Sequence, residues 1–162
     1  MRIGVVSDTH NNLKNVARIV ERFNAAGVER VIHTGDITQA RTLEYFARLQ
    51  APLTGVYGNN DIGERAALDA AVATLGFEFV DPPLELHWHG RRIIVVHDPL
   101  EFRGHLASHH DIALHGHTHR QRIETIDGQL HFNPGECAGM MPGLNAIGVL
   151  DLELLNVEIL KF

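Results

Sequence analysis

Hydrophobic positions follow one pattern in the first half of the chain and another in the second. In the first half, apolar runs at 3–7, 30–34 and 53–57 alternate with longer stretches in which apolar residues recur every three or four positions. The runs are typical of buried strands. The longer stretches predict helices from Asn11 or Asn12 to Gly27, over 40–49, and over 63–75. Strand–helix–strand repetition favours a parallel sheet with right-handed crossovers.

From residue 77 onward the pattern changes to closely spaced strands. The alternation of apolar and polar residues predicts strands at 78–80, 84–89, 92–96, 112–115, 121–126, 129–133, 146–150 and 155–160. Gly90-Arg91 and Asp127-Gly128 lie where hairpin turns are needed. We expect one helix in this half, around 102–109. The most economical assembly is two sheets packed face to face with helices outside.

Length and composition are those of one folded domain covering 1–162. The chain has 162 residues, close to the size of about 150 residues that is usual for one domain. With 14 basic and 20 acidic residues its net charge is −6, which argues against broad nucleic-acid binding because that needs a basic surface. Cys137 is the single cysteine, so no intrachain disulfide is possible. Without a signal-peptide pattern or an apolar stretch of about 20 residues, we expect a cytoplasmic protein with no membrane partner.

Histidine is the unusual component, because seven of the 12 histidines lie between His97 and His119. Four segments place carboxylate, amide or imidazole groups just after predicted strands: Asp8-Thr9-His10, Gly35-Asp36, Gly58-Asn59-Asn60-Asp61 and Gly116-His117-Thr118-His119. Residues two apart in extended chain point the same way, so each such pair can hold one ion. His97 ends a further apolar strand. Because sites in open α/β sheets form at the carboxyl ends of strands, these groups are expected to meet at one edge.

These motifs, in this order, resemble those of the calcineurin-like metallophosphoesterases, in particular their small bacterial and archaeal phosphodiesterase branch. The resemblance covers essentially the whole chain and includes the segment 133–137, Asn-Pro-Gly-Glu-Cys. It implies an α/β fold, a four-layer α/β/β/α sandwich in which two mixed β-sheets are flanked by helices. It also implies two metal ions that share Asp36. One ion is then held by Asp8, His10, Asp36 and His119, and the other by Asp36, Asn59, His97 and His117.

The residue types suit this chemistry. Mixed carboxylate, amide and imidazole ligands favour divalent ions such as manganese, which we expect here, or nickel, iron or zinc. Two such ions bind a hydroxide between them and neutralise phosphoryl oxygens, so that the hydroxide attacks phosphorus in line. The resemblance thus implies a metal-dependent phosphoric diester hydrolase acting on a small phosphodiester. The candidate catalytic residues are Asp36, Asn59, Asn60 and His97.

Asn60 departs from the larger family, which usually carries a histidine at this position. An amide donates hydrogen bonds but no proton at neutral pH. We therefore expect good turnover of diesters with activated aryl leaving groups and poor turnover of alkyl ones, unless His33, His105, Asp98 or a metal-bound water supplies the proton instead. The roles of two neighbours stay open: His33 could orient a ligand or pack in the core, and Arg65 could face the phosphate. Asp61 is expected to cap the third helix.

Several alternatives remain at this level. A phosphomonoesterase or protein phosphatase of the same fold usually keeps the histidine that Asn60 replaces. A non-catalytic metal-binding scaffold is a second alternative, and it predicts lost ligands, whereas all seven positions are intact. A nuclease lacks support because no basic channel is evident. A homodimer or homotetramer is common in this branch, but no segment identifies an interface.

Overall fold

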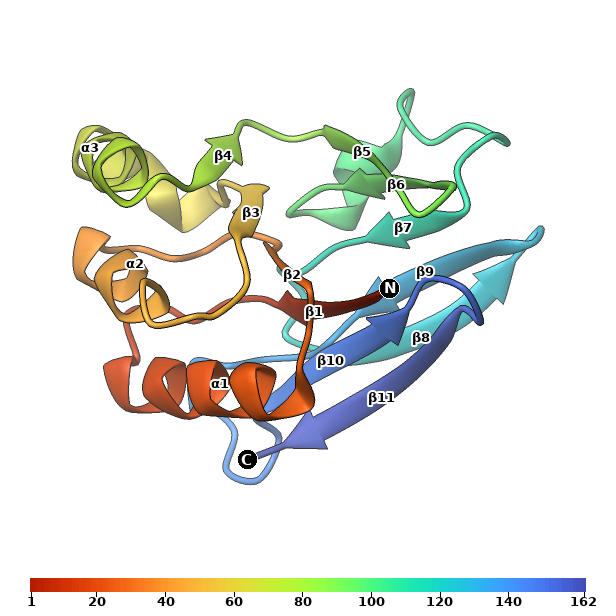
Figure 1. Cartoon of the computed structure of the whole chain (residues 1–162). Helices are drawn as coiled ribbons and strands as arrows, with labels where there is room; N and C mark the ends of the chain where they lie inside the picture. The colour runs from red at the N-terminus through yellow and green to blue at the C-terminus, as the bar shows by residue number, and fades with distance from the viewer.

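Two mixed β-sheets packed face to face form the centre of the molecule in the computed structural model, which describes residues 1–162 (Figure 1). The first sheet has the order β11-β10-β1-β2-β3-β4. Its strands are β1 (Arg2–Val6), β2 (Arg30–His33), β3 (Leu53–Val56), β4 (Glu78–Val80), β10 (Ala146–Asp151) and β11 (Asn156–Lys161). The second sheet has the order β5-β6-β7-β9-β8. Its strands are β5 (Leu84–Trp88), β6 (Arg91–Val95), β7 (Ile112–Leu114), β8 (Arg122–Ile126) and β9 (Gln129–Asn133).

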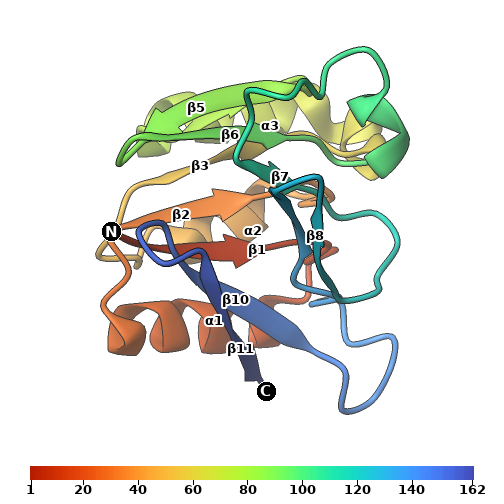
Figure 2. The same ribbon diagram turned by 90° about the vertical axis from the view of Figure 1, so that its right-hand side faces the viewer.

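The predicted parallel pairing holds for the first four strands. Strands β1, β2, β3 and β4 pair in parallel, while β10 runs antiparallel to both β1 and β11. Figure 2 shows β1 and β2 pointing the same way. In the second sheet, β6, β7 and β9 pair in parallel between two antiparallel edge strands. The carboxyl ends of β1, β2, β3, β6 and β7 therefore lead into the segments that carry the predicted ligands.

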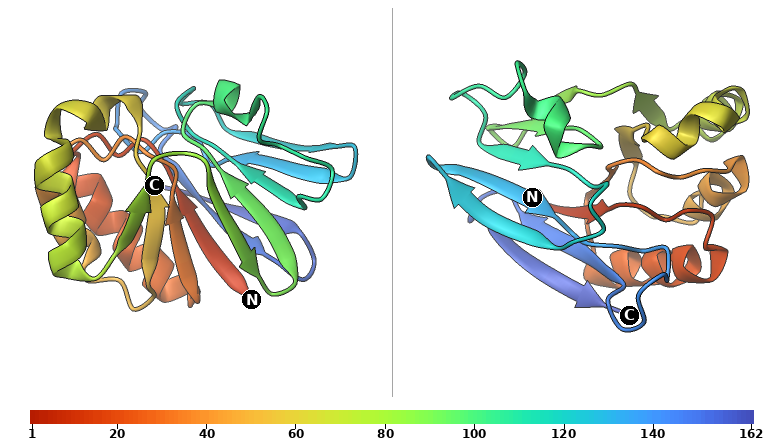
Figure 3. Two further views of the ribbon diagram at one scale, coloured as in Figure 1. Left: turned by 90° about the horizontal axis from the view of Figure 1, so that it is seen from above. Right: turned by 180° about the vertical axis from the view of Figure 1, so that it is seen from behind.

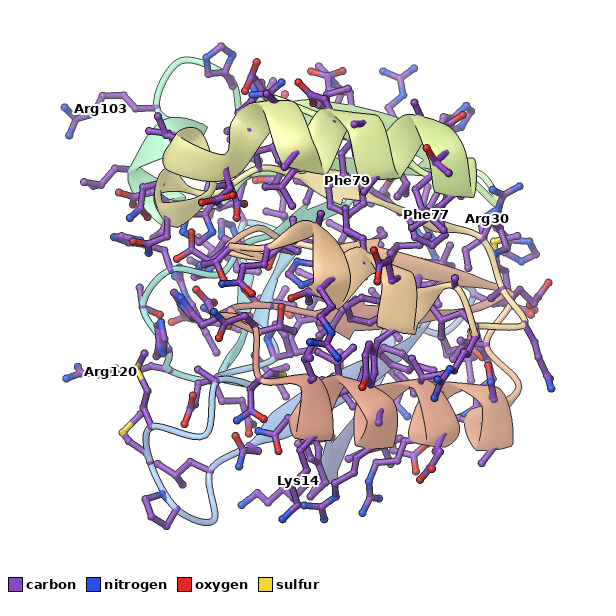
Figure 4. All side chains as sticks on the ribbon, turned by 90° about the vertical axis from the view of Figure 1, so that its left-hand side faces the viewer. Lys14, Arg30, Phe77, Phe79, Arg103 and Arg120 are labelled. Carbon is purple, nitrogen blue, oxygen red and sulfur yellow. The ribbon has the colours of Figure 1, made fainter.

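Three helices cover the outer face of the first sheet: α1 (Leu13–Ala26), α2 (Ala40–Phe46) and α3 (Arg65–Leu75), seen from above in Figure 3. The side chain of Asn12 accepts the backbone N–H of Asn15 at the start of α1, and Gly27 ends the helix in a left-handed conformation. Figure 4 faces this helical layer, with Lys14 projecting outward and Phe79 lying beneath α3. No helix is both long and apolar enough to cross a membrane.

Strand alternation builds two main cores, one beneath the helices and one between the two sheets. Ile3 and Val5 face the second sheet and pack with residues such as Ile93 and Val95, whereas Val6 faces the helices. This alternation of side chains across each strand is the reason that the expected sandwich forms. The expected architecture, two mixed sheets with helices outside, is confirmed.

The layer outside the second sheet differs from its prediction. The helix expected at 102–109 is wrong, because the chain forms a single 3-10 turn, η2 (Pro99–Phe102), followed by irregular turns. Asp98 and Glu101 close the 3-10 turn by capping each other's backbone, and Gly104 then adopts a left-handed conformation (φ +82°) that ends any helix. Phe102 nevertheless covers the outer face of β6 and β7.

Candidate metal centre

The loops that follow five strands bring all seven predicted ligands together. Five of the seven have positive φ angles: Asp8, His10, Asp36, His117 and His119. Residues other than glycine adopt this conformation uncommonly, and the surrounding structure has to enforce it where it is strained. The backbone thus adopts an unfavourable conformation at five of the positions that the motifs identify.

One cluster consists of Asp8, His10 and His119, whose ligand atoms all lie within 4.8 Å of one another. The Nε2 atoms of His10 and His119 are 3.3 Å apart. Nε2 of His119 also lies 3.5 Å from Oδ1 of Asp8, a buried oxygen with no hydrogen-bond partner. Both imidazoles therefore point nitrogen atoms at one spot beside an unpaired carboxylate oxygen.

The second cluster contains Asn59, His97 and His117. Oδ1 of Asn59 lies 3.0 Å from Nε2 of His97 and 3.0 Å from Nδ1 of His117. The two ring nitrogens are 3.3 Å apart. Asp36 lies between the two clusters, with Oδ2 3.3 Å from Nε2 of His10 and Oδ1 3.4 Å from Nε2 of His97. Asp36 thus occupies the position expected of a shared carboxylate.

The donor set fits divalent cations. Two N–H groups facing each other at 3.3 Å would repel, so at least one nitrogen of each imidazole pair is unprotonated and can act as a metal ligand. Asp8 Oδ1 adds a buried acceptor without a donor, and such orphaned polar atoms point to an ion or water at the site. Mixed imidazole, carboxylate and amide ligands suit manganese, iron, nickel and zinc.

Charge in the cleft is dominated by Asp36 and His97. Burial would raise the pKa of Asp36, yet its interactions with His97 and Asn60 hold that pKa well below the usual range. Burial would lower the pKa of His97, but Asp36 and Asp8 raise it to about 9. Burial raises the pKa of Asp8. Without a metal, a proton on His97 therefore provides the positive charge that these carboxylates attract.

His33 connects two of the loops that carry predicted ligands. His33 is fully buried; its Nδ1 accepts the backbone N–H of Gly35 and its Nε2 lies 3.1 Å from Oγ1 of Thr9. Burial, followed by the charge of His97, lowers the pKa of His33 to about 3, so the ring is neutral. This geometry supports the orienting role for His33, because its contacts join the loops after β1 and β2.

The expectation that Asp61 caps the third helix is wrong. Asp61 lies in the 3-10 turn η1 (Asn59–Glu64) that precedes α3. Its carboxylate accepts backbone N–H groups from Gly58 (2.7 Å), Thr38 (2.7 Å) and Asp36 (3.1 Å). An aspartate at such a position is expected to accept backbone N–H groups nearby, as it does from Gly58, but only the fold shows that two of its donors, Asp36 and Thr38, belong to another loop.

Two motif glycines allow the loops to approach so closely. A Cβ atom on Gly58 would collide with the carboxylate of Asp36, and one on Gly116 would collide with Oγ of Ser7. The backbone N–H of His117, next to Gly116, donates to Oδ2 of Asp8 (3.1 Å) and links the two sheets. Glycine at these two positions is therefore required for the close packing of these loops.

A cavity of about 310 Å³ opens beside the second cluster. It is lined by Tyr57, Asp81, Asp98 and Glu101, among others, and by Arg65. The guanidinium of Arg65 contacts the carboxylates of both Asp69 and Asp81. Arg65 therefore reaches the cavity, one of the positions that the sequence allowed, but its charge is already neutralised by the two aspartates.

A third group of potential ligands, Glu85, His109 and His110, lies away from this centre on the second sheet. Nδ1 of His110 accepts the backbone N–H of Ala107 (3.0 Å). In a neutral ring the proton then resides on Nε2, the nitrogen that faces Glu85. A protonated nitrogen cannot bind a cation, so we assign no metal to this group.

Comparison with known proteins defines the class of this fold and site. A model of the calcineurin-like phosphoesterase superfamily domain matches residues 1–154. The chain belongs to this superfamily, as the motifs indicated.

Individual relatives agree with this class. The chain is 35% identical over 157 residues to phosphodiesterase MJ0936 of Methanocaldococcus jannaschii, covering 94% of each protein. It is 25% identical over 167 residues to phosphodiesterase YfcE of Escherichia coli, covering 97% of this chain and 91% of that protein. A solved structure described as a novel archaeal phosphodiesterase superposes with a TM-score of 0.89 at 33% identity, over 100% of both chains. The enzyme class expected from the motifs is the one that these relatives carry in their names.

Proposed function

We propose that this chain is a phosphodiesterase that hydrolyses a small phosphodiester with the help of two divalent metal ions. The observation that carries the proposal is the convergence of the seven predicted ligand side chains into two clusters with Asp36 between them. The family membership and the names of its relatives support the reaction class.

The side chains divide into two ligand sets. Asp8, His10, Asp36 and His119 would hold one ion, and Asp36, Asn59, His97 and His117 the other. When bound, such a pair of ions activates water for in-line attack and neutralises charge on the phosphoryl oxygens. The chain itself contributes orientation, because Asp61 and His33 hold the ligand loops in register through backbone N–H groups.

Asn60 contacts the shared carboxylate. Its side-chain amide donates to Oδ2 of Asp36 (2.7 Å), and its backbone N–H donates to Oδ1 (2.9 Å). These bonds steady Asp36, but an amide cannot protonate a departing alkoxide. Since general acid catalysis typically contributes about 10²–10⁴-fold, the proposed enzyme favours leaving groups that need no proton, such as aryl oxides.

The cavity beside the second cluster favours a diester over a monoester. Its wall carries the carboxylates of Asp81, Asp98 and Glu101, and its one guanidinium, Arg65, is engaged by two aspartates. Outside the predicted ligands, the charged side chains that would meet the additional negative charge of a phosphomonoester are carboxylates and the already paired guanidinium of Arg65. A diester with an uncharged second ester group meets no such repulsion.

The test is metal-dependent hydrolysis of bis-p-nitrophenyl phosphate compared with p-nitrophenyl phosphate. Protein is stripped with a chelator and assayed before and after addition of Mn²⁺. Asp36→Ala removes the shared carboxylate, and Asp127→Asn, at an exposed hairpin turn, serves as the matched control. We expect Mn²⁺ to restore diester cleavage in excess of monoester cleavage in the wild type and in Asp127→Asn only.

Failure has two distinct forms. Faster cleavage of the monoester would instead favour a phosphomonoesterase. No cleavage of either compound with Mn²⁺ or Ni²⁺ would favour a non-catalytic scaffold. The choice of manganese over nickel, iron or zinc, the cytoplasmic location and the homodimer or homotetramer stay predictions.

A further inference from the structure

Glu136 is a buried carboxylate with no counterpart in the predicted ligand set. It lies between β9 and β10, and its side chain has no solvent exposure. Oε1 accepts the backbone N–H of Met141 (2.7 Å), whereas the equally buried Oε2 has no hydrogen-bond partner. An unpaired carboxylate oxygen in the interior is costly, so a donor is expected to face it.

The imidazole of His119 is the group that faces this oxygen. Its Nδ1 lies 3.8 Å from Oε2 of Glu136, just outside hydrogen-bond range. On the other side of the ring, Nε2 faces Oδ1 of Asp8 (3.5 Å) and Nε2 of His10 (3.3 Å). His119 therefore lies between two buried carboxylate oxygens, neither of which has another partner.

We infer that Glu136 is a positioning residue for His119. Its Oε2 accepts a hydrogen bond from Nδ1–H of His119, and this leaves the lone pair of Nε2 directed at the spot shared with Asp8 and His10. Each orphaned oxygen is then satisfied: Oε2 of Glu136 by the imidazole N–H, and Oδ1 of Asp8 by a cation. The inference rests on the proposed function for the presence of that cation.

His117, the other histidine of the segment Gly116-His117-Thr118-His119, provides a contrast. Nε2 of His117 lies 3.7 Å from Oδ2 of Asp98, but these side chains are 41% and 30% exposed. Those of His119 and Glu136 are 21% and 0% exposed. Because solvent screens the exposed pair, the support from Glu136 is specific to the cluster of Asp8, His10 and His119. Loss of this carboxylate should weaken one ion and spare the other.

Glu136→Gln separates this role from a purely structural one. The amide oxygen of glutamine retains an acceptor for the N–H of Met141. Its NH₂ group then faces Nδ1 of His119 and favours the tautomer with a proton on Nε2, which opposes metal binding. Partners of metal-bound histidines typically contribute about 10–100-fold in metal affinity.

The experiment is a Co²⁺ titration of the chelator-stripped full chain, followed by calorimetry and by visible absorption. We expect two ions in the wild type and in the control Glu153→Gln, whose carboxylate is exposed. In Glu136→Gln one ion should bind about 10–100-fold more weakly, with the second unchanged and the metal-free melting temperature near that of the wild type. Wild-type affinity for both ions in Glu136→Gln would overturn the inference, as would equal weakening of both.

A measurement on the wild type keeps the test decisive if Glu136→Gln does not fold. In the ¹⁵N-labelled, Zn²⁺-loaded protein, Nδ1 of His119 should carry a proton that is protected from solvent exchange. A His119 ring protonated on Nε2, or one whose Nδ1 proton exchanges freely, would overturn the inference. A wild type that binds two ions but cleaves no phosphodiester would instead count against the proposed function alone.

Discussion

Replacing Asp61 by asparagine tests whether this one carboxylate holds the ligand loops together. Oδ2 of Asp61 accepts the N–H groups of Gly58 and Asp36, and Oδ1 accepts that of Thr38. Asp36 and Thr38 both have positive φ angles, so their loop depends on such external support. In Asp61→Asn one oxygen becomes an NH₂ group, and the best arrangement turns this group toward the N–H of Thr38.

The magnitude follows from the bonds that are lost. A hydrogen bond to a charged group contributes about 1.5–3 kcal/mol, and a buried N–H left without an acceptor costs about 1–3 kcal/mol. Burial raises the pKa of Asp61. At a pH above the unfolded pKa, burial of the ionised carboxylate therefore lowers the free energy of unfolding, and replacement by asparagine removes this cost. We therefore expect a net loss of about 2 kcal/mol in the free energy of unfolding, or about 4–8 °C in Tm.

The assay is thermal and urea unfolding of the metal-free protein, with Asp127→Asn as the exposed control. Activity on bis-p-nitrophenyl phosphate at saturating Mn²⁺ is measured in parallel, and we expect kcat to fall about 10–100-fold as Asp36 and Asn59 lose their positions. A free energy of unfolding within about 0.5 kcal/mol of the wild type, the range of ordinary surface changes, together with unchanged kcat, would refute the assigned role of Asp61.

Three further predictions use the same site. Asn60→His should raise the hydrolysis rate of a dialkyl phosphate at least about tenfold by supplying a general acid; an unchanged rate would reject this explanation of the aryl preference. NMR titration of the metal-free protein should find His33 neutral down to about pH 4. Since an unfolded histidine binds a proton near pH 6.5 and the buried His33 does not, the free energy of unfolding should fall by about 2 kcal/mol between pH 7 and pH 5 on account of His33. A His33 pKa near 6.5 would contradict its buried, neutral state. Among p-nitrophenyl diesters, kcat/KM should be about tenfold lower for a second ester group ending in a carboxylate than for one ending in tert-butyl; equal values would mean that Asp98 and Glu101 do not face the substrate.

The ligand positions were predictable because they depend on strand ends. Apolar runs identify the strands, and parallel strands place Asp8, Asp36 and Asn59 at one edge whatever their exact length. The division into two clusters was implied by the family resemblance, since periodicity alone locates the side of the sheet but not which nitrogen faces which oxygen. The short distances around Asp36 agree with that division.

Long-range contacts account for what the sequence did not indicate. Arg65 could be placed near the phosphate, but its neutralisation by Asp81 depends on the end of β4 lying beside α3. Glu136 belongs to no motif with the spacing of metal ligands, so the sequence gives no sign of its role. It lies near His119 only because the segment after β9 packs against the loop after β7. In the segment 102–109, which was expected to form a helix, Asp98 caps only a short 3-10 turn and the left-handed conformation of Gly104 prevents its continuation.

The most direct test of the two-ion centre is a crystal structure of the Mn²⁺-loaded protein with anomalous scattering recorded near the manganese absorption edge. The account predicts two anomalous peaks, one bounded by Asp8, His10 and His119 and the other by Asn59, His97 and His117, with Asp36 between them. A single peak would contradict the shared role of Asp36. Peaks only at Glu85 and His110 would contradict the assignment of the metal centre itself.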